Sequence, residues 1–333
     1  MWHSMSLSAA LWLAACVQTV LGGPHDQTTT NADGIRSIPL RTHSLQPPYL
    51  DSDMQSRWFD FAGNTIIRAD QYIRLTSDRP SQAGLIFSRV PLTATNWEIE
   101  VEFKIHGKNV LNGDGFAMWL TKQRATRGDV FGSVDRFEGL GIFFDTYKNN
   151  RPGVVFPYVM AMVGDGNKPY DKANDGKDNE FLGCSARGIR NADIPTKARL
   201  TYFQDKMLKL ELQYKAEGQW EECFETDEPP MIPSVAYLGF SAETGELSDN
   251  HDIISVNTKN LYDTKTRPET TRAKDKDSPK VNKGEHKSKK EPGTGGGSWS
   301  WFFFKVVLFF GFIAAAYAGF TAWRTQQRRS HRF

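Results

Sequence analysis

Alternating apolar and polar residues in the middle of the chain predict β-strands. In residues 97–106 every second side chain is apolar and those between are mostly charged, and residues 208–214 repeat the pattern. The apolar positions are Trp97, Ile99, Val101, Phe103 and Ile105 in the first run and Leu208, Leu210, Leu212 and Tyr214 in the second. Strands of this kind bury one face and leave the other in water.

Residues 49–260 contain many such runs, separated at short intervals by clusters of Gly, Pro, Asn and Asp. No helical periodicity of three turns interrupts residues 50–257. Short strands with frequent turns are typical of an antiparallel β-sandwich. A segment of this length can bury a sizeable core as one domain. We therefore predict an all-β fold, with a single sandwich domain over residues 49–260.

The segments on either side of this domain differ from it in composition. Residues 1–23 hold a short apolar run, preceded only by the weakly basic His3, which indicates a cleaved signal peptide. Residues 24–48 are polar, with scattered Pro and Gly, and we expect a loosely ordered lead-in. Residues 261–298 are dense in Lys, Asp, Glu and Thr and end in a Gly-rich stretch, which predicts a flexible stalk.

Residues 301–323 form an apolar run with one charge, Lys305, near its edge. As a helix this run would extend ~34 Å, enough to cross the hydrocarbon of a bilayer and contact membrane lipid. Four arginines follow it in residues 324–333, so the positive-inside rule predicts a cytosolic tail. The sandwich domain is then lumenal, and the chain is a single-pass type I membrane protein.

Charge and cysteine content narrow the function classes. The 333 residues carry a formal net charge of only +2, and no basic stripe interleaved with aromatic residues points to nucleic acid. Of the three cysteines, Cys16 leaves with the signal peptide. Cys184 and Cys223 remain, and in an oxidising lumen they either form a disulfide or stay as two buried thiols. Neither has a histidine at the spacing of a zinc site or a catalytic nucleophile.

The stretch 139–150 carries the clearest candidate chemistry. A short apolar strand ends at Asp145, and Tyr147 and Asn149 follow at alternate positions. A carboxylate, a main-chain carbonyl and an amide oxygen make a hard oxygen shell that suits calcium. The loop 164–176 is also rich in oxygen ligands. The residues alone leave a second interpretation open, in which both segments are polar loops that cap strands.

Three motifs resemble one known family. Phe-Asp-Thr-Tyr-x-Asn at 144–149 is similar to the metal-and-sugar loop of the L-type (leguminous-type) lectins. Residues 113–119 resemble the strand of that family that carries a sugar-binding aspartate. Residues 245–254 resemble the pocket-closing loop of its membrane-bound cargo lectins, the vesicular integral membrane type. The resemblance covers residues 50–257 and implies a jelly-roll-like sandwich.

The resemblance also implies the site residues. The expected calcium ligands are Asp145, Tyr147, Asn149 and Asp175, and the expected carbohydrate-binding residues are Ser81, Asp114, Asn149, Lys172, Gly245, Glu246 and Leu247. In this pattern Asn149 binds the metal through its oxygen and donates its amide to the sugar. Cys184 and Cys223 match a disulfide of the cargo-lectin branch.

The chain departs from the family pattern at two of these positions. Lys172 stands where the cargo lectins usually have histidine, and Glu246 where relatives often have aspartate. A lysine stays charged where a histidine titrates, so we expect sugar affinity to change little between about pH 7.5 and 6.5.

The implied function is a calcium-dependent lectin that binds high-mannose N-glycans on glycoproteins. It would act as a cargo receptor between the endoplasmic reticulum, the intermediate compartment and the Golgi apparatus. The cytosolic tail, which ends in Phe333, is compatible with vesicle coat proteins. Two other functions remain open at this point. One is a sandwich that recognises protein partners without a working sugar site.

The other open function is a glycoside hydrolase, because Glu98, Glu100 and Glu102 share one strand face, as catalytic carboxylates do in some sandwich-fold glycosidases. Residues two apart on a strand lie roughly 6–7 Å apart, whereas a retaining glycosidase needs carboxyl groups ~5–5.5 Å apart. Nothing adjacent in the sequence desolvates one of the three, as a catalytic acid requires. We therefore expect no enzyme activity.

Overall fold

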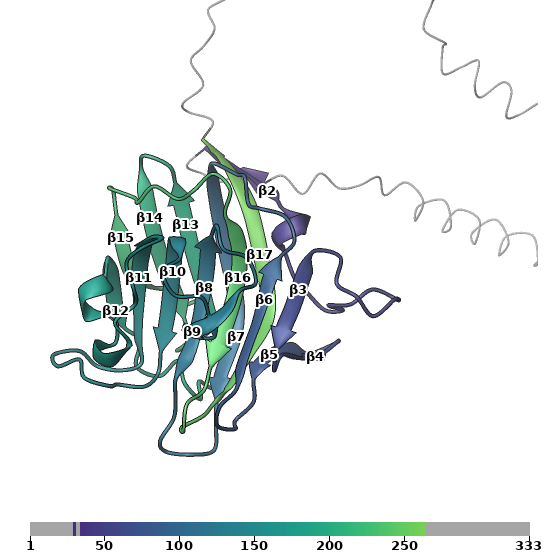
Figure 1. The fold of residues 1–333 in the computed structure, drawn as a ribbon. Coiled ribbons are helices and arrows are strands. Elements are labelled where there is room, and N and C mark those ends of the chain that lie inside the picture. The colour runs from purple at the N-terminus through teal and green to yellow at the C-terminus, as the bar shows by residue number, and fades with distance from the viewer. Residues whose placement is uncertain (1–28, 31–33, 264–333) are drawn as a thin grey trace, which may run out of the picture. The chain divides into compact units, whose positions relative to one another are not determined.

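The computed structural model describes residues 29–30 and 34–263, which fold into two antiparallel β-sheets packed face to face (Figure 1). The only helices in this part of the chain are three-residue 3-10 turns: η1 (Arg41–His43), η2 (Lys172–Asn174) and η3 (Lys177–Asn179). The prediction of an all-β sandwich is therefore confirmed.

The larger sheet has nine strands and carries the alternating runs seen in the sequence. Its order is β1 (Thr29–Thr30), β2 (Ile35–Pro39), β17 (Asn250–Asp263), β7 (Asn96–His106), β13 (Thr196–Phe203), β14 (Met207–Gln213) and β15 (Glu221–Thr226). β5 (Tyr72–Thr76) pairs with β17, and β4 (Ile66–Arg68) pairs with β5. Every second residue of β7 is buried, as expected for a sheet with one face in water.

The second sheet has seven strands and holds the most apolar runs of the chain. Its order is β12 (Leu182–Ser185), β11 (Tyr158–Asp165), β10 (Glu138–Asp145), β8 (Gly115–Thr121), β16 (Tyr237–Glu243), β6 (Ala83–Ser88) and β3 (Phe59–Gly63). All residues of β8 are buried, and all but the first of β10, so both faces of this sheet are covered. Of the seventeen described strands, only β9 (Arg127–Val130) belongs to neither sheet.

Two apolar clusters explain this double burial. The main core fills the space between the sheets and includes Phe103 from one sheet, with Phe116 and Phe144 stacked on the other at 4.5 Å between ring centroids. A second cluster lies on the opposite face of the seven-stranded sheet. There Phe143 stacks on Phe131 at 5.1 Å, and Tyr170 packs against both rings. The loops that carry Phe131 and Tyr170 are thereby anchored to the sheet.

The lead-in over residues 24–48 was expected to be loosely ordered, and from residue 34 onward that expectation is wrong. β2 pairs with β17, and Leu45 donates to the Val256 carbonyl at 2.8 Å. His43 and Leu45 are buried. The segment joins the sheet through main-chain hydrogen bonds, which do not depend on apolar side chains, so its polar composition did not predict a strand. At the other end the domain continues to Asp263 rather than residue 260.

Cys184 and Cys223 form a disulfide, with 5.3 Å between their Cα atoms. Cys184 lies on β12 and Cys223 on β15, which are the last strands at the same edge of the two sheets. The bond therefore joins the sheets covalently at that edge. The structure thus selects the bridge over the two buried thiols, in agreement with the family resemblance.

Several predictions lie outside the described residues. These are the signal peptide over 1–23, the stalk beyond Asp263, the membrane span over 301–323 and the tail over 324–333. The chain divides into the units Met1–Glu269 and Thr270–Phe333, and the second unit lies wholly outside the described part. Within residues 29–30 and 34–263, no helix is long and apolar enough to cross a membrane.

Candidate functional site

The register of three central strands brings together acidic residues that are far apart in the sequence. Asp145, at the end of β10, and Glu243, at the end of β16, both pair with Gly115 at the start of β8. Asp114 therefore lies between them, just outside the sheet. Its N–H donates to the Glu243 carbonyl at 3.2 Å, and its carbonyl accepts from the Thr146 N–H at 3.0 Å.

Gly115 is required at this junction by geometry. Its φ of 139° is one that side chains rarely allow, and a Cβ atom would lie 2.2 Å from the Phe144 carbonyl oxygen. The peptide bond between Gly113 and Asp114 is cis. The close backbone approach at Gly115 holds Asp114 beside the metal-loop residues that follow Phe144.

The expected calcium ligands lie together in the structure. Asp145 accepts a hydrogen bond from the Tyr147 N–H at 3.0 Å. Asp175 accepts from the Asn149 N–H at 3.0 Å and from the Asn149 amide nitrogen at 2.6 Å. Both carboxylates are buried, with exposed fractions of 6% for Asp145 and 1% for Asp175. The oxygen-rich loop of 139–150 is therefore held against the loop of 164–176.

Asn149 also contacts the second carboxylate through its side chain. One N–H of its amide nitrogen donates to Asp175. An amide nitrogen carries two N–H groups, so the other remains for the expected sugar contact. Asp175 itself adopts a left-handed backbone, with φ of 53°, at the end of η2. The Asp171 side chain begins that turn by accepting from the Asn174 N–H, so the turn presents Asp175 to Asn149.

The electrostatics of this cluster suit a cation. Burial raises the pKa of Asp145 well above its ordinary value, and the nearby charge of Asp175 raises it further. Arg151 opposes this effect, but its guanidinium is already paired with Glu180 and donates to the Asp175 carbonyl at 3.1 Å. Two buried carboxylates near each other repel unless a cation lies between them.

The donor set also fits a hard cation. It combines carboxylate oxygens with an amide and a main-chain carbonyl, the ligand types that calcium prefers. In the described part of the chain no group of three or more His, Cys, Asp and Glu side chains could hold a metal ion. A metal here therefore depends on the Asn149 and Tyr147 oxygens as well as on Asp145 and Asp175.

A small pocket of about 50 Å³ adjoins these ligands. Its lining residues are Asp114, Asp129, Phe131, Asp145, Tyr147, Asn149, Tyr170, Lys172 and Glu243. Five of these were predicted from the sequence, whereas Asp129, Phe131, Tyr170 and Glu243 were not. Burial raises the pKa of Asp114 to about 6, Lys172 lowers it, and Glu243 raises it. The pocket is thus an acidic site with one lysine at its rim.

The remaining expected sugar contacts surround this pocket without lining it. Ser81 donates its N–H to the Gly245 carbonyl at 2.9 Å, but its own side chain is exposed. A Cβ atom on Gly245 would lie 3.3 Å from an Asp114 carboxylate oxygen, so this loop's main chain packs against Asp114. Glu246 is exposed, and Leu247 lies near Gly113. The loop 244–249 therefore borders the pocket through its backbone.

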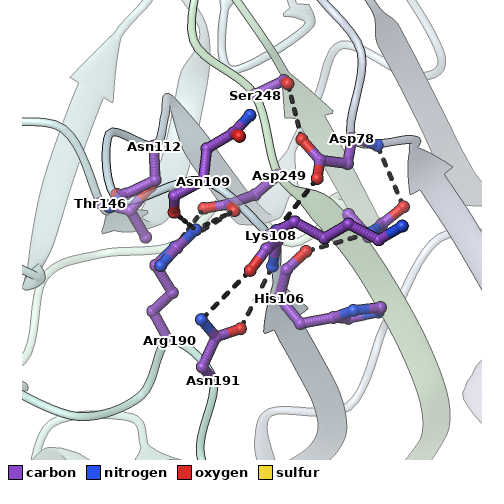
Figure 2. A network of polar contacts seen from close by, with 12 residues as sticks. Asp78, His106, Lys108, Asn109, Asn112, Thr146, Arg190, Asn191, Ser248 and Asp249 are labelled. Carbon is purple, nitrogen blue, oxygen red and sulfur yellow. Dashed lines mark hydrogen bonds and ion pairs between the residues drawn. The ribbon is translucent and has the colours of Figure 1, made fainter.

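A polar network that the sequence did not reveal holds this loop in place (Figure 2). Arg190 pairs with Asp249, and the Ser248 hydroxyl donates to Asp78 at 2.7 Å. Asp78 also accepts from the Lys108 N–H at 3.2 Å, and Arg190 donates to the Asn109 carbonyl at 2.8 Å. Residues from three separate segments thus join the end of the loop in one network. Only the Ser-Asp pair at 248–249 belongs to a recognised motif.

His251 follows the loop but does not face the pocket. It is buried on β17, where its Nδ1 lies 2.7 Å from the Thr76 hydroxyl, and its Nε2 has no partner among the described residues. Burial lowers the pKa of His251 to about 3. A histidine of this kind stays neutral through the range in which histidines usually titrate.

The three glutamates of β7 lie outside the pocket and contact residues of neighbouring strands. Glu98 pairs with Lys259 at 2.7 Å, Glu100 pairs with Arg199 at 2.9 Å, and Glu102 accepts from the Ser255 hydroxyl at 3.2 Å. Each is therefore part of a polar outer sheet face, and none of them lines the pocket.

Comparison with known proteins agrees with this geometry. The family description "Legume-like lectin family" matches residues 36–268. An L-type lectin-like domain-containing protein of Schizosaccharomyces pombe is 39% identical over 67% of this chain and 72% of its own. The canine vesicular integral-membrane protein VIP36 is 36% identical over 90% of this chain and 86% of its own.

A solved structure also resembles the domain. The crystal structure of the VIP36 exoplasmic/lumenal domain in its Ca2+/Man3GlcNAc-bound form has a TM-score of 0.61 and 41% identity, and it covers 66% of this chain and 89% of that one. The family match extends over more than half of the chain, and the motifs around Asp114 and Asp145 fall inside it. The chain belongs to the legume-like lectin family.

Proposed function

We propose that the sandwich domain is a calcium-dependent lectin that binds high-mannose N-glycans. The observation that carries this proposal is the position of Asp114, which lies beside the Asp145–Asp175 cluster in one pocket bordered by the loop 244–249. The related VIP36 domain is described with calcium and a mannose-containing saccharide bound. Asp145, the Tyr147 carbonyl, Asn149 and Asp175 would hold the metal.

The pocket residues suit the chemistry of a saccharide. A sugar hydroxyl both donates and accepts, so it needs an acceptor and a donor at fixed positions. Asp114 supplies the acceptor, and the main chain of Gly245 packs against its carboxylate. Phe131 and Tyr170 line the pocket and offer apolar surface. Calcium would neutralise the paired carboxylates and fix the loop that carries Asn149.

A glycan array with and without a chelator tests the proposal. We expect mannose-rich glycans to be retained in calcium and released when the chelator is added. Retention of no glycan under either condition would favour a protein-binding sandwich, and release of a cleaved sugar would favour a glycosidase. Each of these two outcomes would overturn the lectin assignment.

We further propose that the domain is lumenal and captures glycoprotein cargo for transport between the endoplasmic reticulum and the Golgi apparatus. Support comes from the apolar run 301–323, the arginines after it and the name of the canine relative, a vesicular integral-membrane protein. The tail over 324–333 is then the segment that meets coat proteins. Protease added to intact microsomes should trim only that tail, whereas loss of the sandwich domain would reverse the orientation.

A further inference from the structure

An ion pair between Lys172, which is an expected carbohydrate-binding residue, and Glu243, which is not, spans the rim of the pocket. The Lys172 ammonium donates to Glu243 Oε1 at 3.1 Å and to the Asp129 carbonyl at 3.2 Å. Lys172 lies on η2 and Glu243 ends β16, so the contact joins the loop 164–176 to the sheet. The Lys172 side chain is 51% exposed, whereas that of Glu243 is 20% exposed. The carboxylate is thus the buried partner.

Only one oxygen of this carboxylate is satisfied. Glu243 Oε2 is buried and has no hydrogen-bond partner among the described residues. An ionised carboxylate only accepts, so this oxygen needs a donor. Leaving such a group unpaired is unfavourable, because the oxygen loses its water without gaining a hydrogen bond. Glu243 lines the same pocket as Asp114, so a donor held in that pocket lies within its reach.

Lys172 can donate a further hydrogen bond on the same side of the pocket. A lysine ammonium has three N–H donors. Two of them serve Glu243 and the Asp129 carbonyl. The third remains for an oxygen in the pocket that the two residues line. Together the pair presents one acceptor and one donor, which is the combination that a saccharide hydroxyl satisfies.

The sheet register sets Glu243 apart from the expected contacts. Glu243 faces the pocket from the β16 side of Gly115, whereas Asp145 approaches from the β10 side. Asp114 lies between the two, and its N–H is bound to the Glu243 main chain. A sugar ring held by Asp114 would therefore present a neighbouring hydroxyl to the Glu243 side of the pocket.

We propose that Lys172 and Glu243 form a specificity-determining pair, in which Glu243 Oε2 accepts a hydrogen bond from a hydroxyl of the bound hexose that Asp114 does not hold. Lys172 orients Glu243 and donates to an oxygen of the same sugar. This inference rests on the proposed lectin function and assigns a further contact within it.

The pair is tested by changing the protein and the sugar separately and together, and by measuring each binding affinity by calorimetry. The full chain in detergent, at saturating calcium, is titrated with methyl α-mannoside and with its monodeoxy analogues, each of which lacks one hydroxyl. We expect Glu243→Ala to bind the parent mannoside about tenfold more weakly. The analogue that lacks the hydroxyl bound by Glu243 should bind the wild type about tenfold more weakly than methyl α-mannoside does. Glu243→Ala should bind this analogue and methyl α-mannoside equally well. Equal penalties for every analogue in both proteins would overturn the pair.

Two further variants separate recognition from folding. Glu243→Met keeps the length of the side chain but has no oxygen to accept the hydroxyl. It therefore decides the matter if Glu243→Ala unfolds, and the same non-additive loss is expected of it. Glu138→Ala is the matched control, because Glu138 pairs with Lys122 at the opposite end of β8 and β10. This control should bind every sugar as the wild type does.

A structural defect in the pocket would also weaken calcium binding, so calcium affinity distinguishes such a defect from a loss of sugar recognition alone. Glu243 is not one of the proposed ligands, so Glu243→Ala should bind calcium as the wild type does. A wild-type chain that binds no mannoside at any calcium concentration would reject the lectin function itself. A wild type that binds while Glu243→Ala and Glu243→Met bind equally well would reject only the proposed pair.

Discussion

Arg190 binds the fully buried carboxylate of Asp249 with two nitrogens, Nε at 2.9 Å from Oδ2 and Nη2 at 2.9 Å from Oδ1. Burial raises the pKa of Asp249, and Arg190 opposes the rise. Asp249 ends the loop 244–249, and Arg190 also donates to the Asn109 carbonyl. The pair is therefore a support for the backbone that borders the pocket rather than a contact for the ligand.

Arg190→Met should destabilise the domain by about 3–5 kcal/mol, because it leaves the Asp249 charge buried and unpaired. Mannoside affinity should fall with it, since the loop loses its anchor. Denaturant unfolding and calorimetry measure the two effects. Arg57→Met is the control, since Arg57 and Asp51 form an exposed pair that contributes at most about 1 kcal/mol. A variant as stable as the wild type would contradict the buried support.

Asp145→Asn should abolish calcium binding and sugar binding together, because it removes a charged ligand beside Asn149. Without calcium the variant should be at least as stable as the wild type, since the repulsion from Asp175 is relieved. At 100 times its dissociation constant calcium should stabilise the wild type by about 2.7 kcal/mol and leave the variant unchanged. Thermal unfolding measures both. Asp165→Asn, at the exposed end of β11, should respond to calcium as the wild type does.

Replacing Cys184 and Cys223 by serine should lower the free energy of unfolding by about 3–4 kcal/mol in the loop-entropy model. The bond closes a loop between residues 39 apart in the sequence and joins β12 to β15. Equilibrium unfolding of the oxidised wild type and the double variant measures the loss. An unchanged unfolding midpoint would mean that sheet packing alone holds this edge.

Protonation of His251 should contribute to acid destabilisation. Its pKa is about 3 in the folded domain, against an ordinary histidine value of 6.5, so the unfolded chain takes up the proton first as pH falls. The folded state then loses about 1.4 kcal/mol per pH unit below 6.5. Asp252 favours the charged imidazole, whereas His106 and Arg190 oppose it.

His251→Gln isolates this contribution, because Asp114, with a raised pKa, acts in the opposite direction in both proteins. Between pH 6.5 and 5 the wild type should lose about 2 kcal/mol relative to the variant. Urea unfolding across this range measures the difference. Parallel curves for the two proteins would show that His251 titrates normally.

Sugar affinity should stay nearly constant between about pH 7.5 and 6.5 and fall near pH 6, where Asp114 gains a proton and loses an acceptor oxygen. The Lys172 charge lowers the pKa of Asp114. Lys172→His, largely neutral at pH 7, should therefore move the loss of affinity to higher pH. Mannoside titrations at saturating calcium compare the two. A midpoint that does not move would exclude Lys172 from the control of Asp114.

Local patterns predicted the strands and the motifs because each depends on residues close in the sequence. The alternation of 97–106 became β7, and the oxygen-rich residues after the strand of 139–150 became one wall of the site. The lead-in strand β2 was missed, since main-chain pairing with β17 is independent of side-chain polarity. Its partner lies more than 200 residues away.

The rest of the site depended on how distant strands meet. Glu243 and Lys172 lie 71 residues apart, and only the pairing of β16 with β8 and the turn at η2 bring them together. The Arg190–Asp249 contact spans 59 residues and likewise carries no local signal. The sequence by itself determined the residue types at each position, whereas the burial, ion pairing and pKa shifts of those residues arose only when the sheets packed and removed them from water.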